Sequence, residues 1–149
     1  QIVQAIIDIL KVAAGLIENT DIETYHFGLP SRPEGGSKPS IYVQFNERRW
    51  IDISDQLRHG YDYIFEIGVF HQGADMDQVE KDVTDVMELV EKELRKDANL
   101  TLSGNAEKWD GPMPTDVERE VGPTKGQPIK RAWGRLFRTV RRYEDATLA

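Results

Sequence analysis

Two neighbouring segments, residues 41–53 and 61–70, alternate apolar and polar side chains, and this alternation limits the possible folds more than any other feature of the chain. Successive side chains of a strand point to opposite faces of a sheet, so the pattern predicts two long strands, each with one apolar face. The polar residues 47–49 interrupt the first pattern and predict a bulge near Trp50. The short segment 55–60 between the two strands predicts a hairpin connection.

A long amphipathic helix is expected directly after the second strand. Asp75 or Asp77 would cap its start, where negative charge also suits the helix dipole. The basic residues Lys92, Arg95 and Lys96 would complement the dipole at its other end. Its apolar positions recur at three- and four-residue spacings. They are Val79, Val83, Val86, Met87, Val90 and Leu94.

The remaining patterns complete an α+β chain. They predict an opening helix over residues 2–17, strands over 22–27 and 130–143, and a short strand at Leu100 and Leu102 with an extension to Trp109. Residues 28–40 and 110–128 are rich in Pro and Gly and are expected to be long loops. We therefore expect one domain over residues 1–149, with a mainly antiparallel sheet and two helices packed on one face.

Composition excludes several kinds of protein. The chain has no Cys, so disulfide scaffolds, thiolate metal sites and cysteine nucleophiles are excluded. No apolar run approaches the roughly 20 residues that span a bilayer, so we expect a cytosolic chain. The net charge of −7 argues against neutralising phosphates as the main task. Residues 125–149 nevertheless hold seven Lys or Arg against two acidic residues, a net +5, which leaves −12 elsewhere and favours attraction between copies or to a partner.

The sequence holds few candidates for chemistry. His71, Asp75 and Asp77 follow a predicted strand closely enough to suggest a metal or acid/base site, but helix capping explains both aspartates more simply. A small-ligand module or an enzyme with a pocket near His71, Asp75 and Trp109 stays open as an alternative. Our leading expectation is a protein that is not an enzyme and has no catalytic residue, metal or cofactor.

The last predicted strand suggests an interaction surface. Alternation puts Arg131, Arg135 and Arg141 on one face with Trp133 and Phe137, and Arg and aromatic residues are enriched at protein interfaces. Two alternatives are a solvated sheet face, and a nucleic-acid surface formed by Arg135, Arg138 and Arg141. Trp50 and Tyr42, expected on the polar face of an earlier strand, suggest an interface in the same way. The candidate interface residues are Trp50, Arg131, Trp133, Arg135, Arg138 and Arg141.

The order of these elements resembles the tail terminator and tail-completion proteins of long-tailed bacteriophages, including the lambda-like minor tail proteins. The resemblance covers nearly all of the chain and is one of layout. It is carried by the opening amphipathic helix 2–17, by IYVQFNERRW at 41–50, by YDYIFEIGVFHQGADMDQVEKDVTDVMELVEKEL at 61–94 and by the closing RAWGRLFRTVRRYE.

The resemblance implies a virion protein of the tail, assembled in the host cytoplasm. Its copies would form a ring, typically a hexamer, that caps the tail tube, stops its polymerisation and presents a surface to the head connector. DNA would pass through the ring without being read, which an acidic body allows. The two long loops would contact neighbouring subunits or the tube. A head-completion or neck protein is the near alternative, and the bound partner would decide between them.

Overall fold

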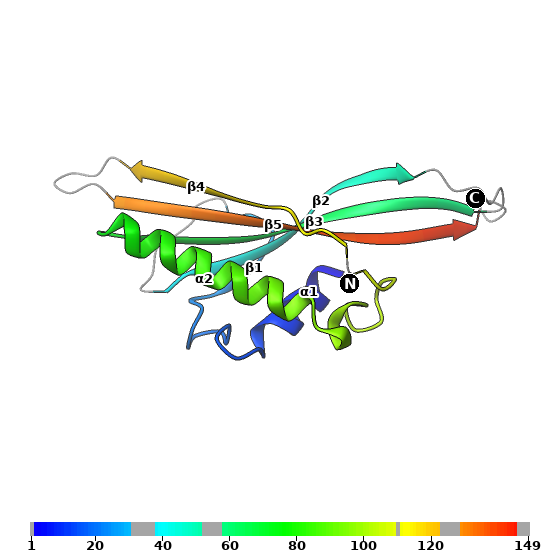
Figure 1. The fold of residues 1–149 in the computed structure, drawn as a ribbon, viewed down its shortest axis with the longest axis horizontal. Helices are drawn as coiled ribbons and strands as arrows, with labels where there is room; N and C mark the ends of the chain where they lie inside the picture. The colour runs from blue at the N-terminus through cyan, green and yellow to red at the C-terminus, as the bar shows by residue number, and fades with distance from the viewer. Residues whose placement is uncertain (1, 31–37, 52–57, 110, 123–128, 146–149) are drawn as a thin grey trace.

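A computed structural model describes residues 2–30, 38–51, 58–109, 111–122 and 129–145 of the chain (Figure 1). Two α-helices, one short 3-10 helix and five strands follow one another within these residues. In chain order they are α1 (Ile2–Lys11), β1 (Tyr25–Phe27), β2 (Ser40–Ile51), β3 (Arg58–Gly73), α2 (Met76–Leu94), a 3-10 helix (Asp97–Asn99), β4 (Thr115–Gly122) and β5 (Ile129–Asp145).

The strands form one sheet in the order β1-β2-β3-β5-β4. The short β1 pairs parallel to β2, and the other neighbouring pairs are antiparallel. Both α-helices lie against the same face of this sheet (Figure 1), which we call the helix face. The expected α+β architecture, a mainly antiparallel sheet with two helices on one face, is confirmed.

The apolar stripe of α2 is buried as predicted. It packs on the helix face of β3 and β5, where Gly134 lets the helix approach closely. A Cβ atom at Gly134 would lie 1.9 Å from Sδ of Met87, well inside van der Waals contact. The start of α2 also follows the prediction, because Asp75 is the N-cap and its carboxylate accepts a hydrogen bond from the backbone N–H of Asp77 at 3.1 Å.

The bulge in β2 lies earlier than predicted. The register shifts between Phe45 and Glu47, so Asn46 is the extra residue and the segment near Trp50 pairs regularly. An extra residue exchanges the two faces of the strand beyond it. Trp50 therefore lies beside Tyr61 on the helix face, whereas Tyr42 lies on the opposite face, which we call the open face. The expectation that Trp50 and Tyr42 share a face was wrong.

Three other boundaries differ from the predictions. The opening helix ends at Lys11, before Gly15, whose φ of +85° ends helical geometry. Leu100 and Leu102 lie in the turns after the 3-10 helix, and the backbone at Leu102 is left-handed with φ of 49°. The strand expected over 22–27 is reduced to β1.

The two predicted long loops have different outcomes. A strand, β4, occupies Thr115–Gly122 inside the segment expected to be a loop over 110–128. Charged side chains on both faces of β4 hide the alternation that would have revealed it. Residues 123–128 of that loop, and 31–37 of the loop over 28–40, lie outside the described residues.

One half of the sheet extends beyond the helices. We call this half the arm and define it as Phe45–Ile51 of β2, Arg58–Ile64 of β3 and Thr139–Asp145 of β5. Figure 1 shows these three strands continuing past the ends of both α-helices. The far end of the arm thus carries the apolar alternation of the sheet without the helical layer, whereas Val140 at its base is still buried in the core.

Candidate subunit interface

Four aromatic side chains form a row along the helix face of the arm. Phe45 contacts Tyr63, Tyr63 contacts Tyr61, and Tyr61 contacts Trp50, with ring centroids 6.1, 6.3 and 5.4 Å apart. We call these residues the aromatic row. Phe45 and Trp50 are 51% and 56% exposed. Large aromatic side chains exposed together are typical of protein-binding surfaces.

Two arginines lie against the same row. The guanidinium of Arg48 lies 4.6 Å from the ring centroid of Tyr61, and that of Arg142 lies 5.9 Å from the centroid of Tyr63. Arg142 also donates a hydrogen bond to the carbonyl of Asn105 at 3.2 Å. Cation–π contacts of this kind hold the arginines over the rings. The helix face of the arm therefore combines the two residue types most enriched at interface hot spots.

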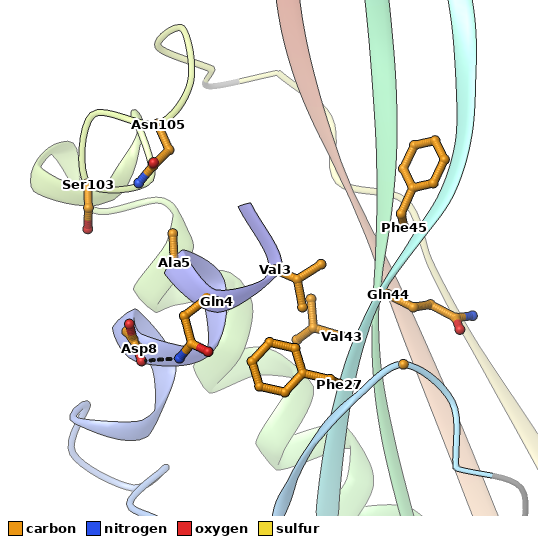
Figure 2. Close-up of a pocket in the computed structure, with 11 residues that line it drawn as sticks. Val3, Gln4, Ala5, Asp8, Phe27, Val43, Gln44, Phe45, Ser103 and Asn105 are labelled. Carbon is orange, nitrogen blue, oxygen red and sulfur yellow. Dashed lines mark hydrogen bonds between the residues drawn. The ribbon is translucent and has the colours of Figure 1, made fainter. Parts of the chain in front are cut away.

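A groove at the base of the aromatic row separates α1 from β2 (Figure 2). It has a volume of about 690 Å³, and Phe45 lies at the end nearest the arm. The carboxylate of Asp8 on its helical side accepts a hydrogen bond from Gln4 at 2.6 Å. The other lining residues are Val3, Ala5, Phe27, Gly28, Val43, Gln44, Ser103 and Asn105. The groove thus continues the apolar surface of the arm toward the helical layer.

On the open face, a buried cluster fixes Trp133. The hydroxyl of Tyr42 donates to the carboxylate of Glu66 and accepts a hydrogen bond from Nε1 of Trp133 at 2.9 Å. Burial, and the bond to Glu66, raise the pKa of Tyr42 well above its usual value. Gly68 leaves room for this ring, since a Cβ atom there would lie 2.0 Å from it. Trp133 is thus a half-buried member of a hydrogen-bonded cluster.

The arginines predicted to share the open face do so, as alternation along β5 requires. Each of them, however, already has an acidic partner within the chain. The nearest nitrogen–oxygen distances are 3.6 Å for Arg131 with Glu120, 2.7 Å for Arg135 with Asp116 and 2.9 Å for Arg141 with Asp62. These three arginines are consequently not free positive charges, and their side chains are poorly placed to bind nucleic-acid phosphates.

Arg138 was wrongly placed at the interface. Its side chain points to the helix face, as alternation with Leu136 and Val140 requires, and is fully buried. It donates hydrogen bonds to the carbonyls of Leu100, at 2.8 Å, and Thr139. Burial lowers the pKa of its guanidinium to about 10. Arg138 therefore fastens the turn after α2 to β5 and takes no part in an exposed surface.

His71, Asp75 and Trp109 do not form a common pocket. His71 is buried, with its Nε2 atom 3.4 Å from the carboxylate of Asp82 on α2, and burial lowers its pKa. The ring of Trp109 instead lies 5.3 Å from the guanidinium of Arg141. Arg141 is level with Asp62 of β3, nine residues from His71, which corresponds to about 30 Å along a strand. The alternative prediction of a ligand site formed by these residues was therefore wrong.

A metal cluster and a membrane-spanning helix are both absent from the described residues. They contain no group of three or more His, Cys, Asp or Glu side chains that could hold a metal ion. No helix in this part of the chain is long and apolar enough to cross a membrane. The aromatic row and the groove beside it therefore remain as the candidate binding surfaces of the described residues.

Comparisons with known proteins add little. No protein-family model matches the chain. No curated protein has a matching sequence. Among solved structures, a chain from the virion of a native gene transfer agent (GTA) particle is similar with a TM-score of 0.38 and 15% identity, over 93% of each chain.

Proposed function

We propose that this protein is a structural subunit of a virion, of the tail terminator type, and not an enzyme. Its copies would close into a ring, with six as the expected number, that caps a tail tube and presents a surface to the head connector. DNA would pass through this ring without specific binding. The element order that resembles the tail terminator proteins supports this proposal.

The observation that carries the proposal is the arm with its exposed aromatic row. A sheet that continues beyond its helical layer leaves apolar surface in water, which is unfavourable unless another molecule covers it. The row lies on the paired strands β2 and β3, so its side chains are held in place before binding. Such a surface is more useful for a permanent subunit contact than for a transient one, because obligate interfaces are the more apolar class.

The internal ion pairs of β5 fit this function as well. Arg131, Arg135 and Arg141 are each bound to a carboxylate of a neighbouring strand, so the basic residues stiffen the sheet. With these charges neutralised, an acidic protein exposes few sites that would hold DNA during its passage. A head-completion or neck protein would share these properties, and binding to the tail tube separates the two roles.

Native mass spectrometry and electron microscopy of the purified chain test the proposal. We expect a closed ring that binds the ends of isolated tail tubes. A strictly monomeric protein at high concentration, with no binding to tubes, would overturn it.

The contribution of the aromatic row is tested with matched variants. We expect Trp50→Ala and Phe45→Ala to raise the concentration needed for assembly by about tenfold or more, the size expected when an interface anchor is truncated. Val12→Ala is the control, because Val12 is 75% exposed and lies just after α1, outside the row. Equal assembly by all three variants would show that the row is not the interface.

A further inference from the structure

Besides the outer side of the three-residue β1, two longer strand edges of the sheet have no neighbouring strand among the described residues. β1 pairs with β2 only at Ile41–Val43, so the outer side of β2 from Phe45 to Trp50 borders no described strand. We call this segment the β2 edge. β4 is the last strand on the opposite side, and its outer side over Thr115–Gly122, the β4 edge, borders none either. Strand edges of this kind are ready templates for pairing with another chain.

A further strand edge, the outer side of β5 beyond β4, is partly covered by another segment of the same chain. Beyond β4, the outer side of β5 is bordered by the segment that follows α2. The backbone N–H of Phe137 donates to the carbonyl of Pro114 at 3.0 Å, and Arg142 donates to the carbonyl of Asn105 at 3.2 Å. Together with the short outer side of β1, the β2 and β4 edges thus remain as open strand edges of the described sheet.

Resting on the proposed function, we infer that the subunits join head to tail, with the β4 edge of one copy pairing antiparallel with the β2 edge of a second copy. The direction follows from the sheet itself. β2, β3, β5 and β4 alternate in direction, so a second copy placed beside β4 presents its β2 antiparallel to it. The helix faces of the two copies then lie on the same side.

Apolar side chains on the two edges match in spacing. Val117 and Val121 are 41% and 58% exposed on the helix face of β4, four residues apart. Phe45 and Trp50 are level with Phe65 and Tyr61 of β3, which are also four residues apart, because Asn46 is taken up by the bulge. Antiparallel pairing therefore sets Phe45 opposite Val121 and Trp50 opposite Val117, and joins four exposed apolar side chains.

Charge favours this pairing over two symmetric ones. The β4 edge carries Asp116, Glu118 and Glu120 against Arg119, a net −2, and the β2 edge carries Arg48 and Arg49 against Glu47, a net +1. Pairing of two β4 edges or of two β2 edges would oppose like charges. The register given above sets Arg49 opposite Glu118.

Two like-charged pairs occur in that register, and each member has a partner within its own chain. Glu47 and Glu120 would face each other, but Glu47 is bound by Arg49 at 2.6 Å and Glu120 by Arg131 at 3.6 Å. Arg48 and Arg119 would also face each other. Arg48 lies over the ring of Tyr61, and Arg119 is bound by Glu80 at 3.2 Å.

The test uses the absence of Cys from the chain, because each introduced thiol is then unique. Arg49→Cys and Glu118→Cys are made separately, since both side chains are exposed in the single chain. Under mild oxidation or with a short thiol cross-linker, we expect covalent dimers when the two variants are mixed and none from either variant alone. The double variant should give a ladder of cross-linked species that ends at the ring number.

A matched pair controls for random collision. Lys92→Cys lies at an exposed position on α2, away from both edges, and mixed with Glu118→Cys it should give at least tenfold less cross-linked dimer. Cross-linking of one variant with itself, at the level expected for the mixture, would overturn the inference, because it indicates a symmetric contact.

Electron microscopy of the unmodified protein separates this inference from the proposed function. A closed ring without cross-linking between Arg49→Cys and Glu118→Cys would overturn the edge pairing and leave the proposed function in place. A ladder without an upper limit, with filaments in the images, would support the edge pairing and overturn the closed ring. Monomers without cross-links would overturn both.

Discussion

The two halves of the sheet share strands β2, β3 and β5 but differ in what lies on their helix face. In the covered half, Ile41, Ile67 and Leu136 are buried beneath α1 and α2. In the arm, Phe45 and Trp50 continue the same apolar side of the sheet and are half exposed. The comparison teaches that alternation along a strand specifies an apolar face without specifying what covers it. In one half the chain covers itself, and in the other we propose that a second molecule does.

The largest expected loss of stability comes from truncating one buried side chain in the covered half. Leu136→Ala should lower the free energy of unfolding by about 2–5 kcal/mol, the usual effect of a large-to-small change in a packed core. Trp50→Ala in the arm should lower it by about 1 kcal/mol or less, since much of that side chain is already in water. Urea denaturation of both variants at concentrations too low for assembly measures the difference. Equal losses would show that the arm is part of the core.

Replacing Arg138, which lies at the boundary between the halves, should cause the next largest loss of stability. Arg138→Met keeps most of the side-chain volume but leaves the carbonyl of Leu100 without its bond to the guanidinium. We expect a loss of about 1–3 kcal/mol, the usual effect of removing one partner of a buried hydrogen bond. Thermal unfolding gives the size of the loss, and hydrogen exchange at residues 100–106 should rise selectively. An unchanged exchange rate there would contradict the role assigned to Arg138.

Weakening an ion pair within the arm should lower the free energy of unfolding by a smaller amount. Asp62→Asn weakens the two hydrogen bonds that Arg141 donates to this carboxylate, at 2.9 and 3.1 Å. Because the pair is partly in water, we expect a loss of about 0.2–1 kcal/mol that shrinks at high salt. Asp85→Asn on the outer side of α2 is the matched control for an exposed pair. A loss that does not depend on salt would indicate a tighter environment than the arm provides.

The smallest effect should be a pH dependence that belongs to the covered half. Burial lowers the pKa of His71 in the folded state, so the unfolded chain binds a proton more readily as the pH falls through about 6.5. The folded state should therefore lose stability as the pH falls from 7.5 to 5.5. His71→Gln should show a flatter profile over that range. The same slope in both proteins would mean that other groups cause it.

Much of the covered half was predictable from the sequence. The stripe and cap of α2 and the alternation of β3 and β5 each pointed to one structure. Alternation along β5 also placed Arg138 with Leu136 on the apolar side, a signal that its charge concealed. The arm was less predictable, because Asn46 can be identified as the bulged residue only once β2 is paired with β3. β4 was missed because Arg119 interrupts the apolar side between Val117 and Val121.

Because Asn46 is bulged, the pairing of this one residue decides which side chains the arm presents on each face. Were Asn46 paired regularly with β3 instead of bulged, every side chain from Glu47 onward would turn to the other face. Arg49 would then take the side now held by Trp50, and the indole would stand among the carboxylates and guanidiniums of the open face. A homologue that paired this residue regularly could keep the same monomer and still lose its neighbours.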